Sequence, residues 1–144
     1  MTPNILAPGA VLILWTLVML VWVGVTRFRA LAKSGIDLKA APPGGRGGDL
    51  EGILPPIANW KSHNYTHLLE QPTVYYAVAI ALAVGGMGGG LNAQIAWAYV
   101  ALRIVHSLIQ VTINRVMWRF AVFALASLAL FALCLHAFMG FVLH

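Results

Sequence analysis

The sequence predicts an all-α integral membrane protein, a four-helix bundle with a single domain over residues 1–144. Composition is the first reason, because 60% of the residues are hydrophobic and 9% are charged, whereas a soluble domain carries about 25% charged residues. The mean hydropathy of +0.83 agrees. The third reason is that four apolar segments are each long enough to cross ~30 Å of hydrocarbon at ~1.5 Å per helical residue. These spans cover about residues 5–25, 62–84, 93–114 and 116–143.

The first span is followed by basic residues and then by a long polar segment. Arg27, Arg29 and Lys33 come directly after it, as in a stop-transfer sequence. The segment 26–61 is rich in glycine and proline at its centre, so we expect an irregular loop there.

The second span contains Pro72, which has two interpretations. If a helix runs through Asn64–Glu70, the proline leaves the carbonyl of Leu68 without a donor and kinks the helix. Alternatively, Pro72 begins a new helix, in whose first turn its missing N–H costs nothing. We favour the kink, because Asn64–Glu70 is amphipathic at helical spacing.

The remaining connections are short and orient the chain. Gly85–Asn92 contains five glycines and no charge, and a tight turn around Ile113–Val116 joins the last two spans. Six Lys and Arg residues lie in 26–61, and Arg115 and Arg119 follow the turn. Because basic loops stay in the cytoplasm, we expect both termini on the opposite, non-cytoplasmic side.

The third span carries a polar stripe inside the predicted membrane region. Arg103, His106, Gln110 and Asn114 share one helix face at i, i+3, i+7 and i+11. A buried arginine in a membrane helix normally faces the bundle interior and has a partner, and Glu70 is the acidic residue nearest a membrane boundary. The pair could form part of a polar ligand site or could only fix helix packing.

Several other functions are disfavoured. His63, His67 and Glu70 share a helix face, but this single His-x-x-Glu run lacks the paired motifs of di-iron bundles, so we predict no metal site. The single cysteine, Cys134, excludes an internal disulfide. No basic stripe with interleaved aromatic residues indicates nucleic acid binding.

Two motifs resemble a known family, the membrane-associated proteins in eicosanoid and glutathione metabolism (MAPEG). N-Y-T-H-L-L-E-Q-P, Asn64–Pro72, resembles the family's second-helix motif, and R-I-V-H-S-L-I-Q-V-T-I-N-R, Arg103–Arg115, resembles its Arg-x-x-His run and following turn. The resemblance covers Asn59–Phe141 and identifies a divergent, bacterial-type member. It implies a homotrimer in a bacterial inner membrane, in contact with membrane lipids and binding a lipophilic small molecule.

The resemblance also implies glutathione as co-substrate, bound between subunits at the cytoplasmic side, with transferase or peroxidase activity on lipophilic electrophiles. Arg115 corresponds to the arginine that stabilises the glutathione thiolate, with Arg119 as the nearest substitute. The implied glutathione-binding residues are Lys61, His67, Glu70, Arg103, His106, Gln110 and Asn114.

This chain departs from the family pattern at three positions. Lys61 or Ser62 stands where the family usually has arginine, His67 where it has asparagine, and Gln110 where transferases often have tyrosine. Lysine lacks the planar fork that holds a carboxylate in two places. The sequence therefore leaves a second function open, a non-catalytic trimer that binds a lipid or small amphiphile at the same site.

Overall fold

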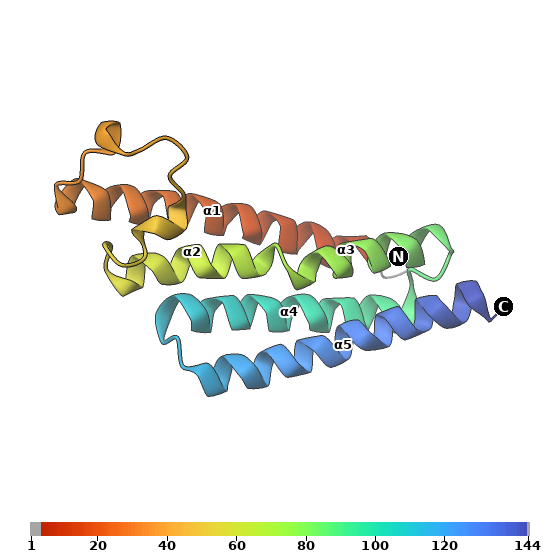
Figure 1. The fold of residues 1–144 in the computed structure, drawn as a ribbon. Coiled ribbons are helices and arrows are strands. Elements are labelled where there is room, and N and C mark those ends of the chain that lie inside the picture. Colours follow the sequence, from red (N-terminus) through yellow and green to blue (C-terminus); the bar gives the residue numbers. More distant parts are fainter. Residues whose placement is uncertain (1–3, 144) are drawn as a thin grey trace.

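The computed structural model describes residues 4–143 and contains only helices and loops over that range. Five α-helices form the molecule (Figure 1). The long connection after the first helix includes two short 3₁₀ helices, η1 (Leu38–Ala40) and η2 (Gly47–Leu50). The α-helices are α1 (Leu6–Ser34), α2 (Pro56–Leu68), α3 (Gln71–Val84), α4 (Gly90–Thr112) and α5 (Val116–Val142).

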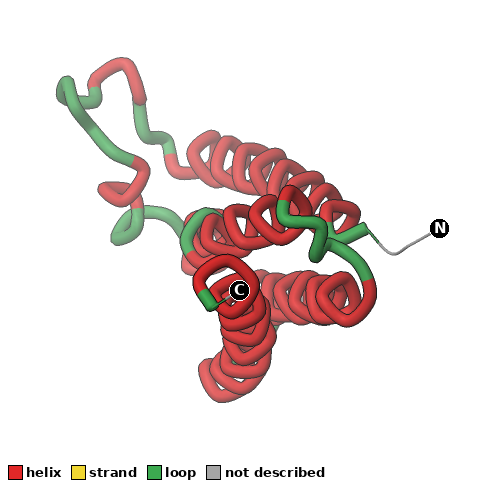
Figure 2. The backbone as a smooth tube through the Cα atoms, turned by 90° about the vertical axis from the view of Figure 1, so that its right-hand side faces the viewer, coloured by secondary structure: helices red, strands yellow, loops and turns green. Residues whose placement is uncertain are grey.

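The helices form an elongated bundle in which α2 and α3 follow one another along a common line (Figure 1). Helices α4 and α5 pack against each other along their length, and α1 packs on α2, α3 and α4. The view along the bundle in Figure 2 shows α5 on its outer side. Both ends of the described chain lie at one end of the bundle, and the long loop and the α4–α5 turn lie at the other.

Three helices of the described chain, α1, α4 and α5, are long and apolar enough to cross a membrane. They support the predicted integral membrane protein. Neither α2 nor α3 is long enough alone, so the predicted second span is divided between two helices. Large apolar side chains cover the outside of the bundle, including Leu14, Val21, Leu128 and Phe131, as expected for surfaces that face lipid.

The break between α2 and α3 combines the two interpretations of Pro72. The proline lies in the first turn of α3, and the chain leaves helical geometry at Glu70 (φ −85°, ψ −96°). The N–H of Leu69 donates to Thr66 O over 2.9 Å, and the Thr73 hydroxyl donates to Glu70 O over 2.6 Å. These bonds cap the end of α2 and the start of α3, so the helix is broken and restarted rather than bent.

Helix α1 continues beyond the predicted span, through the basic cluster to Ser34. Leu31 in this extension packs with Leu54 and Ala58 in a second small apolar cluster. The helix stops where Gly35 adopts a left-handed conformation (φ 70°), as helix C-termini often do. The irregular part of the loop is therefore shorter than the predicted segment 26–61.

The turn between α4 and α5 is as tight as the sequence predicts. Asn114 adopts a left-handed conformation (φ 49°), which asparagine tolerates better than most residues. Its N–H donates to Ile109 O over 2.7 Å, so it closes the end of α4. The turn brings the start of α5 directly beside the end of α4.

Candidate functional site

Arg103 is the centre of the polar site. Its side chain is 0% exposed although it carries a permanent charge. One nitrogen, Nη2, donates to His67 Nδ1 over 2.8 Å and to the His67 carbonyl over 3.0 Å. The other two nitrogens, Nε and Nη1, are buried and have no partner among the described residues. The ring of Phe123 lies 5.7 Å from the guanidinium.

The predicted ion pair between Arg103 and Glu70 is not formed in the described chain. Glu70 is exposed and lies in the break before α3, and the only ion pair within residues 4–143 joins His63 to Glu51. The helix break is the physical reason that this ion pair is absent. In one continuous helix Glu70 would lie near the face of His67, and the break at Glu70 removes that relationship. Arg103 instead reaches the last turn of α2, where carbonyl groups lack helical donors and favour a cation.

Two imidazoles stack beside Arg103. The rings of His67 on α2 and His106 on α4 have centroids 4.8 Å apart and planes within 18°. Phe123 on α5 packs edge-on against His67, with centroids 5.5 Å apart. Side chains from three helices therefore meet at one place near the cytoplasmic end expected from the sequence.

An open cleft of about 210 Å³ lies against these rings. Its lining combines two imidazoles and a guanidinium with three apolar side chains. Its lining residues are His67, His106, Val116, Arg119, Phe120 and Phe123.

The hydrogen bond from Arg103 fixes the tautomer of His67. Arginine has donors and no acceptor, so His67 Nδ1 must accept with its lone pair. The imidazole is then neutral and carries its proton on Nε2. Neither ring nitrogen of His106 makes a hydrogen bond to any residue in 4–143, so both remain available to a ligand.

The other residues of the predicted stripe lie further along α4. Gln110 is buried and Asn114 is half-buried, and the side-chain oxygen of each has no partner among the described residues. They extend the polar face from the cleft toward the α4–α5 turn. The structure thus gathers Arg103, His106 and Gln110 on the buried face of α4, as the spacing predicts.

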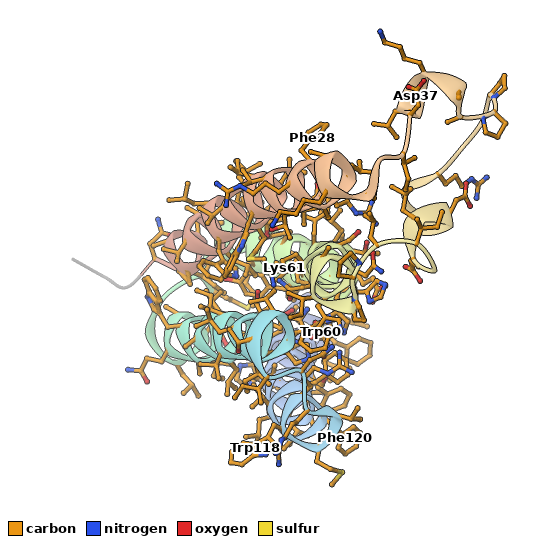
Figure 3. The ribbon with its side chains drawn as sticks, turned by 90° about the vertical axis from the view of Figure 1, so that its left-hand side faces the viewer. Phe28, Asp37, Trp60, Lys61, Trp118 and Phe120 are labelled. Atoms are coloured by element: carbon orange, nitrogen blue, oxygen red, sulfur yellow. The ribbon has the colours of Figure 1, made fainter. Side chains whose placement is uncertain are left out.

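Lys61 and Arg115 are placed away from the cleft. The Lys61 ammonium lies 5.7 Å from the ring centre of Trp22, on the side of α2 that faces α1. Figure 3 shows it well separated from Trp118 and Phe120 at the start of α5. Arg115 is exposed at the N-cap of α5, whereas Arg119, one turn later, is half-buried and lines the cleft.

Sequence reasoning missed a second polar cluster beside the first. Ser107 Oγ accepts a hydrogen bond from Trp15 Nε1 over 2.9 Å and another from Asn64 Nδ2 over 2.7 Å. This serine joins α1, α2 and α4 inside the core. Ser107 follows Arg103 by four residues, and residues i and i+4 share a helix face, so this spacing could have placed Ser107 on the buried face of α4.

The three residues considered as metal ligands do not come together. His63 is exposed and contacts Glu51 over 2.6 Å, whereas His67 faces the cleft. Over the residues that the structure describes, no group of three or more His, Cys, Asp or Glu side chains could hold a metal ion.

Comparison with known proteins agrees with the fold and with the two motifs. The model of the MAPEG family matches residues 5–139, which is most of the chain. No curated protein and no solved structure matches it. The match includes every residue of the cleft and all five α-helices up to the last turn of α5. The chain is an integral membrane protein that belongs to the MAPEG family.

Proposed function

We propose that the protein is a glutathione-dependent transferase or peroxidase that acts on lipophilic electrophiles as a homotrimer. The observation that carries this proposal is Arg103, a fully buried guanidinium with two donors left without partners in the described chain, beside a cleft that holds a second arginine. Binding an anion here would give the buried guanidinium the partners that it lacks, so we infer that the site binds an anionic ligand.

The energetics of Arg103 favour a carboxylate. A buried charge is costly unless it is paired, and each buried donor without a partner costs about 1–3 kcal/mol. A carboxylate oxygen can accept a charge-assisted hydrogen bond from either free nitrogen, Nε or Nη1. Glutathione has two carboxylates, and the exposed Glu70 could receive its amino group at the edge of the same region.

Arg119 is better placed than Arg115 to stabilise a thiolate. Helix α5 runs back alongside α4. Arg119 is four residues after Arg115 and therefore lies about 6 Å further along the bundle, in the direction of Arg103. Arg119 thereby shares the cleft with His106, three residues from Arg103 on α4. A cation beside a thiol lowers the thiol pKa from its usual value of about 8.5.

The size of the cleft supports an assembly of several chains. Small-molecule sites usually enclose about 300–1,000 Å³, whereas this cleft measures about 210 Å³. One chain therefore holds part of the tripeptide, and a neighbouring protomer covers the remainder. The apolar wall formed by Val116, Phe120 and Phe123 gives a lipophilic electrophile a route from the bilayer to the sulfur.

A second candidate function is non-catalytic binding of a lipid or small amphiphile. The observation that favours it is a pair of apolar grooves along α1, of about 240 and 230 Å³; the first lies against α3, and the second lies against the end of α2 and the start of α3. Both include Ile13 and Tyr76, so they follow one another along the bundle. An acyl chain is the kind of ligand that fits a continuous apolar groove open to the membrane.

A pair of variants one helical turn apart tests the proposed activity. In Arg119→Ala we expect bound glutathione without its ultraviolet thiolate band and a kcat about 100-fold lower, with a smaller change in KM. Arg115→Ala is the matched control, because Arg115 is exposed and lies outside the cleft. Equal loss in the two variants would contradict the role given to Arg119.

A further inference from the structure

We propose that His106 is the proton acceptor that converts the bound thiol into a thiolate. This inference rests on the proposed function, and it adds a catalytic base to the electrostatic role of Arg119. The observation behind it is that His106 is 4% exposed, lines the cleft and makes no hydrogen bond through either ring nitrogen to the described residues.

A histidine that only fills space in a core usually has a partner for its polar atoms. His106 has lateral contacts instead, because its ring stacks on His67 and lies at a tilt to Phe123, with centroids 6.1 Å apart. These contacts hold the plane of the ring and leave its edge to the cleft. The ring is therefore oriented by its neighbours, as a base must be.

His67 provides the complementary donor. Arg103 occupies its Nδ1, so the N–H at Nε2 is the only hydrogen that this ring can offer. Two stacked imidazoles consequently present different groups to the same cleft, an N–H on His67 and a lone pair on His106. A sulfur in the cleft at the edges of the two rings can lose its proton to His106 and be stabilised by the N–H of His67.

The groups around His106 are cationic or neutral, so His106 can accept a proton only when the thiolate forms beside it. His67 faces it from α2, Arg103 from its own helix and Arg119 from α5, and no carboxylate lines the cleft. The nearest acidic group, Glu70 at the start of α3, is exposed. An imidazolium alone would add to two positive charges, whereas a thiolate formed at the same moment offsets it.

The step is balanced as a proton transfer followed by substitution. The S–H bond of glutathione breaks, its electron pair stays on sulfur as the thiolate, and the proton forms an N–H bond on His106. The thiolate then attacks the electrophilic carbon, and the leaving group departs with its electron pair. His106 returns the proton to that group, so the base is restored without an added oxidant or reductant.

Proton counting on the unaltered protein tests the proposal. Glutathione is added near pH 7 while thiolate absorbance and proton release to the buffer are both recorded, and S-methylglutathione, which has no thiol, gives the background. We expect clearly fewer than one proton released for each thiolate formed, because His106 retains the proton. One proton released per thiolate would overturn the role of His106 and leave the proposed function intact.

A variant gives the second readout. In His106→Gln we expect one proton released per thiolate, a thiolate that appears only at higher pH, and a kcat about 100-fold lower with a smaller change in KM. His63→Gln is the matched control, because His63 is exposed and pairs with Glu51 outside the cleft. An unchanged pH profile in His106→Gln would overturn the inference. Absence of any thiolate in the unaltered protein at millimolar glutathione would overturn the proposed function as well.

Discussion

Two polar clusters lie side by side on α4, and they are built in different ways. At Ser107, the donors of Trp15 and Asn64 both end on one fully buried hydroxyl oxygen, while Asn64 Oδ1 has no partner among the described residues. At Arg103, one nitrogen is bonded, two are without partners in the described chain, and a cleft opens beside the stacked imidazoles. The first cluster is neutral and joins three helices through one acceptor, whereas the second leaves two nitrogens of a charged group without partners in the described chain, next to a cleft.

Polar side chains inside a membrane protein can either join helices, as at Ser107, or bind a ligand, as we propose for Arg103. Bonds between helices are worth only about 0.6–2 kcal/mol in a membrane, so the neutral cluster at Ser107 gives a modest gain in stability. An unsaturated charged cluster has a cost in the empty protein, and a matching ligand removes that cost. Mutations in the two clusters should consequently have opposite consequences for stability and for binding.

The largest expected effect comes from Arg103→Met, which keeps an apolar stem and removes the charge. We expect glutathione binding to weaken by about 10- to 100-fold, because the ligand carboxylate loses a charge-assisted hydrogen bond. The empty protein should melt at or above the temperature of the parent, because a buried cation with unsatisfied donors is gone. Calorimetric titration and thermal melting in detergent measure both quantities.

Arg29→Met is the control for that variant, because Arg29 is exposed on the extension of α1 beyond the predicted span. It should leave glutathione affinity unchanged. A large fall in the melting temperature of Arg103→Met alone would show that Arg103 mainly stabilises the bundle, and the contrast between the two clusters would be lost.

Ser107→Ala is expected to have an intermediate effect, on stability rather than binding. It leaves the Trp15 and Asn64 donors without their acceptor in the core, which costs about 1–3 kcal/mol of unfolding free energy. Glutathione affinity should change by less than about threefold, since the serine does not line the cleft. Ser62→Ala on α2, which loses no hydrogen bond to the described residues, is the control for the unfolding measurement.

The smallest effect is expected at the loop. Glu51→Gln removes the charge that meets His63, and both side chains are about half exposed, at 50% and 47%. Exposed pairs of this kind contribute at most about 1 kcal/mol, and the Glu51 carbonyl keeps its bond from Asn59. Equilibrium unfolding should detect little change. A loss of glutathione binding here would mean that the loop takes part in the site.

The sequence was sufficient to predict much of this arrangement. Hydropathy located the apolar helices, Pro72 located the break, and helical spacing placed Arg103, His106 and Gln110 on one buried face. These features depend on periodicity within a single helix, which the chain encodes locally. The two motifs also identified the family that the comparison with known proteins shows.

The partners across helices could not be predicted in the same way. Spacing along the sequence does not say how one helix is rotated against another, and the break at Glu70 changes the register of everything after it. For that reason Glu70 was expected to pair with Arg103, and His67 is found there instead. The choice between Arg115 and Arg119 likewise depends on the rotation of α5 after the turn at Asn114.

The most direct test is a titration of the purified full-length protein with glutathione near neutral pH, followed in the ultraviolet against S-methylglutathione. We expect a saturable thiolate band at millimolar glutathione, although the free thiol is almost fully protonated at that pH. The same band should be absent in Arg119→Ala. Failure of the parent protein to produce any thiolate band at saturating glutathione would contradict the central claim, and would favour the lipid-binding function of the α1–α3 groove.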